Sequence, residues 1–268
     1  MPRALVTGCS TGIGRATAVE LSKRGFEVIA TARKPATLDD LDVAAKLALD
    51  VDSDESVAAA VAAAGEVDVL VNNAGFGVIG PVESVPLAEV KRMFETNVFG
   101  VIRMIQAVLP QMRERGSGTI VNVTSLAGRV APPLDGFYSA TKFGVEGLSE
   151  ALHYEVSHFG IRVVLVEPGV IATQFGANEQ IYGEDAAPYD ELARLWADAR
   201  GNIPGNPGDG EAPGPELVAA TIADAIEAPE YRLRHPSGPD AELVTSIRAQ
   251  LDDATFEATM RETLAFDW

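Results

Sequence analysis

The chain has 268 residues, of which 47% are hydrophobic, and a formal net charge of −18. This length and apolar content suit one large α/β domain. The acidic balance argues against nucleic acid or an anionic membrane as a partner, because both are bound through clustered lysine and arginine. The only cysteine, Cys9, excludes an internal disulfide, and the three histidines are too scattered to predict a metal site.

The apolar runs are too short to span a bilayer. Residues 1–3 lead directly into the first predicted strand, without the charged-then-apolar order of a signal peptide. We therefore expect a cytoplasmic protein that has no membrane partner.

Strand and helix patterns alternate along the chain. Short apolar stretches predict strands at residues 4–7, 26–31, 47–50, 67–71, 118–124, 161–166 and 231–235. Helical periodicity occurs between them, at residues 16–25, 53–64, 87–112, 136–159, 189–199 and 216–227, and two short helices finish the chain. This alternation predicts a single α/β domain over residues 1–268: a doubly wound parallel sheet of about seven strands with helices on both faces. Ligands bind such sheets at the carboxyl ends of the strands.

Residues 174–215 differ in composition from the rest of the chain. Apart from the helical pattern at 189–199, glycine and proline are too dense there for regular structure. We interpret this segment as a flap and loop over the substrate, since such lids must move. The alternative is a surface insertion without a function.

A glycine-rich turn follows the first predicted strand. Residues 4–14 read A-L-V-T-G-C-S-T-G-I-G, so Gly8, Gly12 and Gly14 connect the strand to a helix. Glycines let the backbone approach a ligand closely, and the amide groups and dipole of a helix N-terminus favour an anion. The turn therefore predicts a pyrophosphate site, and Cys9 within it is interpreted as a small residue that fills space.

Tyr138 and Lys142 are four residues apart in the helix predicted at 136–159, so they share one face. An ammonium group beside a phenol stabilises the phenolate and lets the tyrosine exchange a proton near neutral pH. Ser125, thirteen residues before the tyrosine, supplies a hydroxyl that could hold a carbonyl oxygen. The three residues together predict a device that protonates a carbonyl while a hydride reaches its carbon.

Six motifs occur along residues 3–175 in a characteristic order. They are T-G-C-S-T-G-I-G at 7–14, N-N-A-G at 72–75, Asn97, Ser125, Y-x-x-x-K at 138–142 and P-G-V-I-A-T at 168–173. On these motifs the chain resembles the classical short-chain dehydrogenase/reductase family, which has a Rossmann-type fold. The text around the motifs looks most like the 17β-hydroxysteroid and retinol dehydrogenase branch.

The resemblance implies roles for individual residues. Tyr138 would be the general acid or base, Lys142 would lower its pKa and bind the nicotinamide ribose, and Ser125 would orient the substrate oxygen. Asn97 would bend its helix and hold a water in a proton relay to the lysine. The cofactor-binding positions implied in this way are Gly8, Ser10, Thr11, Gly12, Ile13, Gly14, Arg33, Asp50, Val51, Asn73, Ala74, Gly75, Tyr138, Lys142, Pro168, Gly169, Val170 and Thr173.

The end of the second predicted strand favours NADP over NAD as the cofactor. Family members that use NAD carry an acidic residue there, which binds the adenosine ribose and repels a 2′-phosphate. Ala32 occupies that place in this chain and Arg33 follows it. A guanidinium can hold a phosphate with paired hydrogen bonds.

An apolar set of side chains is expected to form the substrate pocket: Phe76, Val78, Leu126, Val130, Pro132, Phe137, Phe175, Tyr182, Leu195 and Trp196. Such walls favour a hydrophobic ketone or secondary alcohol, steroid-like or retinoid-like. Two alternatives stay open, a 3-oxoacyl reductase that binds a carrier through Arg103, Arg113 or Arg129, and an NADP-sensing protein without chemistry. The resemblance also implies a homodimer or homotetramer.

Overall fold

The computed structural model describes residues 1–176, 180–183, 187–203 and 212–268. Its centre is a seven-stranded sheet in the order β3-β2-β1-β4-β6-β7-β9, with every pairing parallel. The strands are β1 (Arg3–Val6), β2 (Glu27–Ala32), β3 (Ala45–Ala48), β4 (Val69–Asn72), β6 (Gly118–Val123), β7 (Ile161–Pro168) and β9 (Arg234–Ser237). The predicted doubly wound α/β fold is therefore confirmed.

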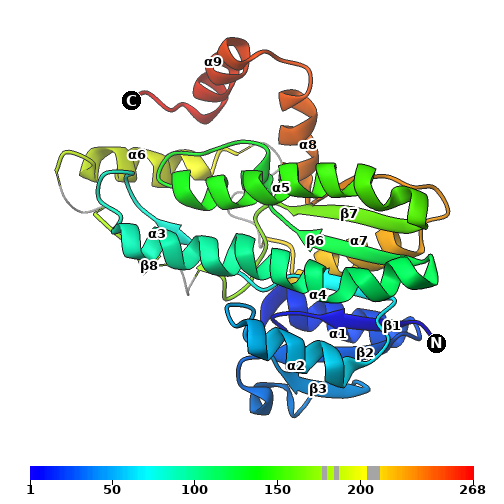
Figure 1. Ribbon diagram of the computed structural model, residues 1–268. Coiled ribbons are helices and arrows are strands. Elements are labelled where there is room, and N and C mark those ends of the chain that lie inside the picture. The colour runs from blue at the N-terminus through cyan, green and yellow to red at the C-terminus, as the bar shows by residue number, and fades with distance from the viewer. Residues whose placement is uncertain (177–179, 184–186, 204–211) are drawn as a thin grey trace.

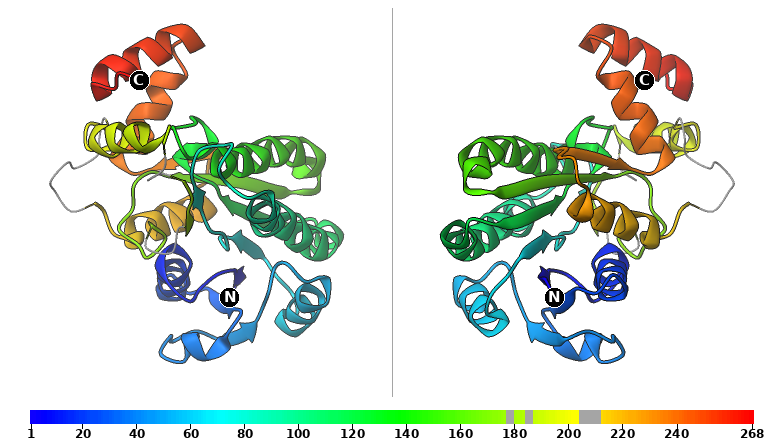
Figure 2. Two further views of the ribbon diagram at one scale, coloured as in Figure 1. Left: turned by 90° about the vertical axis from the view of Figure 1, so that its left-hand side faces the viewer. Right: turned by 90° about the vertical axis from the view of Figure 1, so that its right-hand side faces the viewer.

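Helices cover both faces of this sheet (Figures 1 and 2). One face packs against α1 (Gly12–Lys23) and α7 (Pro215–Glu227), and the other against α2 (Asp54–Ala64), α4 (Gly100–Arg115) and α5 (Gly136–Val156). Strand residues alternate between the two layers: Ala4 and Val6 face α1, while Leu5 faces the opposite layer. Because both faces are buried, the central strands are nearly continuous in apolar residues, which is why they could be located from the sequence.

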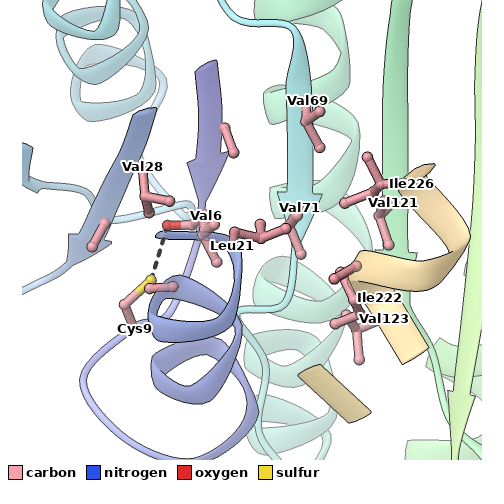
Figure 3. Packing of buried hydrophobic residues seen from close by; sticks show 14 of the residues in the cluster. Val6, Cys9, Leu21, Val28, Val69, Val71, Val121, Val123, Ile222 and Ile226 are labelled. Carbon is pink, nitrogen blue, oxygen red and sulfur yellow. Dashed lines mark hydrogen bonds between the residues drawn. The ribbon is translucent and has the colours of Figure 1, made fainter. Parts of the chain in front are cut away.

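Figure 3 shows the layer between the sheet and helices α1 and α7, where Val71, Val121 and Ile222 pack together. Cys9 lies in the same layer, fully buried, with its thiol donating to the Val6 carbonyl at 3.2 Å. Burial raises the pKa of this thiol to about 12, so it stays protonated. Cys9 thus fills space beneath the glycine turn, as expected.

Several predicted boundaries were wrong by two or three residues. The edge strand β3 begins at Ala45 rather than at 47, because it pairs with β2 in the register Ile29 to Ala45. At the opposite edge β9 begins at Arg234 instead of 231, since it pairs with β7 from Leu165 onward. Edge strands carry weaker apolar patterns than central ones, so their ends are set by pairing that the sequence does not display.

The single helix predicted at 87–112 is interrupted. Helix α3 (Leu87–Phe94) is followed by a π-helical turn, η2 (Glu95–Phe99), before α4 begins. The apolar period continues through the turn, which hid it from the sequence pattern. A small parallel pair, β5 (Val78–Ile79) with β8 (Gln180–Ile181), was also not predicted. Short 3₁₀ turns occur elsewhere in the chain, at η1 (Pro35–Leu38), η3 (Leu126–Gly128) and η4 (Ser157–Phe159).

The last helices are α6 (Asp190–Arg200), α8 (Pro239–Arg248) and α9 (Asp253–Leu264). In Figure 1, α8 and α9 stand at the top, far from strands β1 to β3. Residues 204–211, which contain most of the predicted glycine-proline loop, lie outside the described residues. In the described part of the chain, no helix is long and apolar enough to cross a membrane.

Candidate active site

A cavity of about 1250 Å³ lies where β1, β4, β6 and β7 end. Eighteen of the sequence-predicted site positions line it: Gly8, Ser10, Thr11, Gly12, Ile13, Arg33, Asp50, Val51, Asn73, Ala74, Gly75, Ser125, Tyr138, Lys142, Pro168, Gly169, Val170 and Thr173. Two predicted residues, Gly14 and Asn97, do not line the cavity but lie behind its wall. One concave site thus combines the glycine turn with the three residues predicted to act on a carbonyl.

The glycine turn is fastened to the end of β4 by Asn73. The Asn73 side-chain amide donates to the Thr7 carbonyl at 2.9 Å, and the Thr7 hydroxyl accepts the backbone amides of Asn73 and Ala74 at 2.9 and 3.0 Å. Gly8 has φ of +72°, a conformation that side chains disfavour. Helix α1 then starts at Gly12, with no acidic residue in its first turn. Such an N-terminus fits a pyrophosphate.

The need for glycine at position 14 comes from packing and not from contact with a ligand. A Cβ atom at this position would collide with the Gly8 carbonyl and with the Asn73 side-chain amide. Only glycine lets helix α1 approach the β1 turn and the end of β4 this closely.

We therefore expect Gly14→Ala to lower the melting temperature by several degrees and to weaken dinucleotide binding, since the turn must move to admit a methyl group. Thermal unfolding followed by circular dichroism measures the first effect. The matched control is Gly201→Ala, where the new Cβ meets only ordinary contacts at 3.6 Å. A Gly14→Ala protein as stable as this control would contradict the packing role.

Arg33 follows the end of β2 and lines the same cavity, on the far side of the glycine turn from Tyr138. Its side chain is exposed, and its guanidinium forms no ion pair with any residue that the structure describes. By contrast, Arg15, in the first turn of α1, is paired with Asp40. Arg33 is thus a cation available to a ligand at this end of the cavity.

Lys142 is buried, 8% exposed, on the face of α5 that turns toward β6. Its ammonium donates to the Val123 carbonyl at 3.0 Å and lies 5.5 Å from the centre of the Tyr138 ring. Burial lowers the pKa of Lys142 to about 8, and the negative charge of Glu146 opposes that shift. A lysine with this pKa is still mostly an ammonium ion at neutral pH.

Tyr138 and Ser125 complete the group. Tyr138 is half-buried, and its ring packs against Phe175 with 5.6 Å between centroids. Ser125 follows β6, where its hydroxyl accepts the Ala127 amide at 3.0 Å and donates weakly to the Pro168 carbonyl at 3.5 Å. The long second contact leaves the hydroxyl free to turn toward a substrate oxygen.

Asn97 sits at the centre of the π-helical turn and is 2% exposed. Its carboxamide accepts the Phe76 amide at 3.1 Å, donates to the Phe76 carbonyl at 2.9 Å, and donates to the Thr141 hydroxyl at 3.2 Å. The side chain therefore ties the segment after β4 to α5, beside Lys142. The turn accounts for the predicted bend, while the water relay stays a prediction.

Six of the ten predicted pocket-wall residues line the cavity: Phe76, Leu126, Val130, Pro132, Phe175 and Trp196. The prediction was wrong for the other four. Val78, Phe137 and Tyr182 pack into a separate cluster with Met93 under the β5–β8 pair. Leu195 packs in the same cluster of α6 and α9 residues as Trp196, but only Trp196 also lines the cavity.

Helix α9 and the residues after it supply walls that the sequence did not reveal. Phe256, Met260, Leu264 and Phe266 line the cavity, and Phe266 meets Trp196 of α6 edge to face at 5.8 Å. These residues belong to no motif. The amphipathic pattern of α9 predicts only that one face of this helix is covered.

Asp135 is a further cavity residue that the sequence analysis missed. It lies one helical turn before Tyr138 and lines the cavity, and its carboxylate does not cap α5. Burial raises the pKa of Asp135 to about 6, an effect that the charge of Arg200 partly offsets. The cavity thus contains a carboxyl group close to the tyrosine, and its lining also includes the charged residues Arg200, Glu257 and Arg261.

Comparison with known proteins identifies the class. The family model for short chain dehydrogenase matches residues 2–181, and the chain belongs to this family of oxidoreductases. Retinol dehydrogenase 8 from Bos taurus is 34% identical over 285 residues, spanning 98% of this chain and 90% of that protein.

Two solved structures extend the comparison. A short-chain dehydrogenase from Streptomyces avermitilis superposes with a TM-score of 0.82 at 37% identity, covering 100% of this chain and 98% of that one. A 3-ketoacyl-(acyl-carrier-protein) reductase from Brucella melitensis, complexed with NADH, gives a TM-score of 0.73 at 28% identity over 88% of this chain and 96% of that one. The family assignment from the sequence motifs is therefore confirmed.

Proposed function

We propose that this protein transfers a hydride between NADP(H) and a hydrophobic ketone or secondary alcohol. The observation that carries the proposal is the single cavity in which Ser125, Tyr138 and Lys142 meet the glycine turn. NADPH, when bound, supplies the hydride. The residues of the chain orient the carbonyl, exclude water and deliver the proton.

The proton chemistry follows from the three side chains. The Ser125 hydroxyl donates a hydrogen bond to the substrate oxygen and holds it near Tyr138. The Tyr138 phenol gives its proton to that oxygen in reduction and takes it back in oxidation. Lys142 stabilises the phenolate that is left, because its ammonium lies beside the ring.

The choice of NADP rests on Ala32 and Arg33. Ala32 at the end of β2 offers no carboxylate to bind the adenosine ribose. Arg33, which is exposed and without an ion pair among the described residues, can clamp the 2′-phosphate instead. Ser10 and Thr11 line the same part of the cavity and can add hydroxyl donors.

The apolar character of the substrate side supports a hydrophobic substrate. Phe175 packs on Tyr138 itself, and Trp196 with Phe266 closes the outer wall. The name of the bovine relative, retinol dehydrogenase 8, agrees with a hydrophobic alcohol. The expectation of a homo-oligomer stays a proposal, supported by the exposed aromatic rings of Phe99, Phe143 and Tyr154.

The 3-oxoacyl alternative loses part of its support, although the Brucella relative has that activity in its name. The expected carrier site needed a free cation at the cavity mouth. Arg129 instead binds the buried Glu167 carboxylate at 3.0 Å, and Arg103 is paired with Asp54 and Glu95. Neither of these two guanidinium groups is left to hold a phosphate, and the third candidate, Arg113, does not line the cavity.

The proposal is tested by following the absorbance of reduced nicotinamide with steroid, retinoid, aromatic and acyl-thioester carbonyl compounds, using NADPH and NADH in parallel. We expect turnover with NADPH on the apolar ketones. Turnover on the acyl thioester alone would favour the 3-oxoacyl reductase. Tight NADPH binding with no turnover on any compound would favour the NADP-sensing protein.

A further inference from the structure

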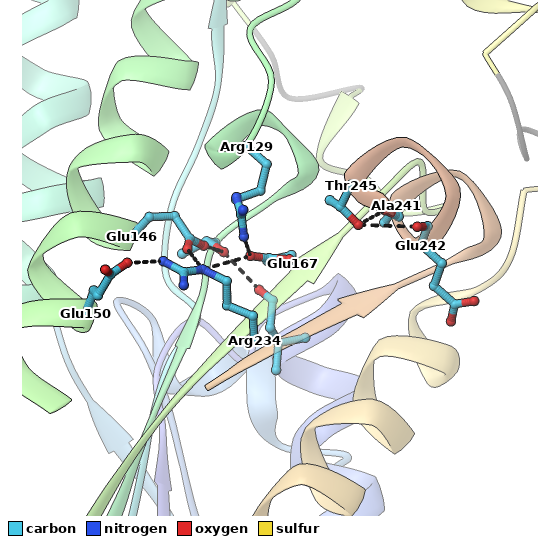
Figure 4. A network of polar contacts seen from close by, with 10 residues as sticks. Arg129, Glu146, Glu150, Glu167, Arg234, Ala241, Glu242 and Thr245 are labelled. Atoms are coloured by element: carbon cyan, nitrogen blue, oxygen red, sulfur yellow. Dashed lines mark hydrogen bonds and ion pairs between the residues drawn. The ribbon is translucent and has the colours of Figure 1, made fainter. Parts of the chain in front are cut away.

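Two buried carboxylates, those of Glu146 and Glu167, are paired with Arg234 and Arg129 (Figure 4). The Glu146 side chain, on α5, is 6% exposed, and that of Glu167, at the end of β7, is fully buried. Arg234 of β9 donates to Glu146 at 2.9 Å and to the exposed Glu150 at 2.6 Å, and lies 3.5 Å from Glu167. Arg129 donates to the same oxygen of Glu167, Oε1, at 3.0 Å. None of these residues is explained by substrate or dinucleotide binding.

Glu146 is attached to the same stretch of β6 as Lys142. The Lys142 ammonium donates to the Val123 carbonyl at 3.0 Å, and the next residue, Thr124, donates its hydroxyl to Glu146 at 2.7 Å. Ser125 follows immediately. At the end of β6, Val123 therefore contacts the lysine, Thr124 positions Glu146, and Ser125 presents the catalytic hydroxyl.

The packing around Gly128 brings Glu146 and Lys142 together. They are four residues apart on α5, so they stand one above the other on one face. A Cβ atom on Gly128 would lie 3.1 Å from Glu146 and 3.4 Å from the backbone and Cβ of Lys142. Because Gly128 has no side chain, the loop after Ser125 packs closely against both residues.

The charges of the network leave Glu146 as the anion that acts on the lysine. Burial and the nearby Glu146 charge raise the pKa of Glu167, and one of its oxygens has no hydrogen-bond partner among the described residues. Glu146 accepts hydrogen bonds at both carboxylate oxygens, from Thr124 and from Arg234. Its negative charge opposes the fall in the pKa of Lys142 that burial causes.

We propose that Glu146 is a positioning residue for Lys142: its carboxylate, fixed by Thr124 and Arg234, keeps the buried lysine in its ammonium form through the reaction. This inference rests on the proposed function, in which the ammonium supports the Tyr138 phenolate. Arg234 lies beyond residues 2–181, which the family model matches, so the device depends on the C-terminal part of this chain.

The charged groups around Lys142 come from four elements. Tyr138 and Glu146 lie on its own helix α5, Arg129 follows η3, Glu167 ends β7, and Arg234 begins β9. The two arginines favour a neutral lysine, and each is paired with a buried carboxylate. Removing the charge of Glu146 would leave Arg234 paired with the exposed Glu150 and with Glu167, which it shares with Arg129, and would take away the carboxylate whose charge raises the pKa of the lysine.

The test compares Glu146→Gln with Glu150→Gln. Both variants remove one carboxylate from α5 that contacts Arg234, but Glu150 is on the exposed side and makes no contact with β6. For ketone reduction we expect kcat/KM of the wild type to fall as pH rises through about 8, where Lys142 loses its proton. In Glu146→Gln the fall moves to lower pH by about one unit, while Glu150→Gln follows the wild type. Coincident profiles for Glu146→Gln and the wild type would overturn the proposal.

A second measurement does not depend on turnover. The chain has five lysines, so the Cε carbons of a lysine-labelled protein can be titrated by NMR, and Lys142→Arg identifies the Lys142 signal. We expect the Lys142 midpoint to fall in Glu146→Gln and not in Glu150→Gln. This result would stand even if no ketone were reduced, which separates failure of the inference from failure of the proposed function.

Should Glu146→Gln fail to fold, Glu146→Asp provides the same test in a milder form. Aspartate keeps the charge but withdraws it by one methylene group, so we expect a smaller downward shift of the Lys142 midpoint. An Asp variant with the wild-type midpoint would contradict the proposal.

Discussion

Replacing Tyr138 with phenylalanine is expected to reduce kcat by about 1000-fold or more, while NADPH binds within about twofold of the wild-type affinity. The phenolic hydroxyl is the only part of the side chain that is lost. The ring still packs against Phe175 and stays beside the Lys142 ammonium. The fold and the dinucleotide site are therefore preserved, and the loss measures proton transfer alone. Initial rates of ketone reduction and titration of NADPH fluorescence give the two quantities.

Tyr154→Phe is the matched control, because Tyr154 lies on the same helix and is 74% exposed. It loses the same hydroxyl without any contact to the cavity, and we expect wild-type turnover. If Tyr138→Phe kept more than a tenth of the wild-type kcat, the assignment of the proton donor would be wrong.

The second large effect is expected from Arg33→Ala. A guanidinium that holds a phosphate by charge-assisted hydrogen bonds contributes about 2 kcal/mol, which corresponds to roughly a 30-fold rise in the KM for NADPH. The KM for NADH should change by less than about twofold, because NADH has no 2′-phosphate for Arg33 to bind. Saturation curves for both dinucleotides, measured with one ketone, give the comparison.

Lys34→Ala removes the neighbouring cation, which does not line the cavity, and it should leave both KM values unchanged. Equal rises for NADPH and NADH in Arg33→Ala would show that the residue supports the turn and does not select the cofactor. An unchanged KM for NADPH would remove the basis for preferring NADP.

The central sheet could be predicted because buried parallel strands are continuous apolar runs. Val69 to Val71 and Val163 to Val166 show this plainly. The ends of β3 and β9 could not be predicted, since each is set by pairing with one neighbouring strand. The π-helical turn around Asn97 was hidden for another reason: its neighbours Val98 and Val101 continue the apolar pattern of the flanking helices.

The dinucleotide side of the cavity was predictable because short motifs follow individual strands. Gly8 after β1, Asn73 after β4 and Ser125 after β6 meet because the carboxyl ends of parallel strands share one edge. The substrate side of the cavity was not predictable in this way. Phe256 and Phe266 reach it from the end of the chain, and no motif encodes the packing of Phe266 on Trp196 of α6.

The network behind Lys142 was missed for a similar reason. Glu146, Glu167 and Arg234 come from three elements, and each alone is typical of a solvated surface charge. Their burial follows from the pairing of β7 with β9 and from the packing of α5 on β7. Only the assembled fold shows that one arginine joins these carboxylates.

The most direct test of hydride transfer is the fate of a deuterium label. NADPH carrying deuterium in place of both hydrogens at the reactive carbon of the nicotinamide ring is incubated with an apolar ketone, and the alcohol is analysed by mass spectrometry. We expect one deuterium at the carbinol carbon with the wild-type protein and no alcohol above background with Tyr138→Phe. An alcohol without deuterium, or tight NADPH binding with no alcohol from any ketone, would contradict the proposed function.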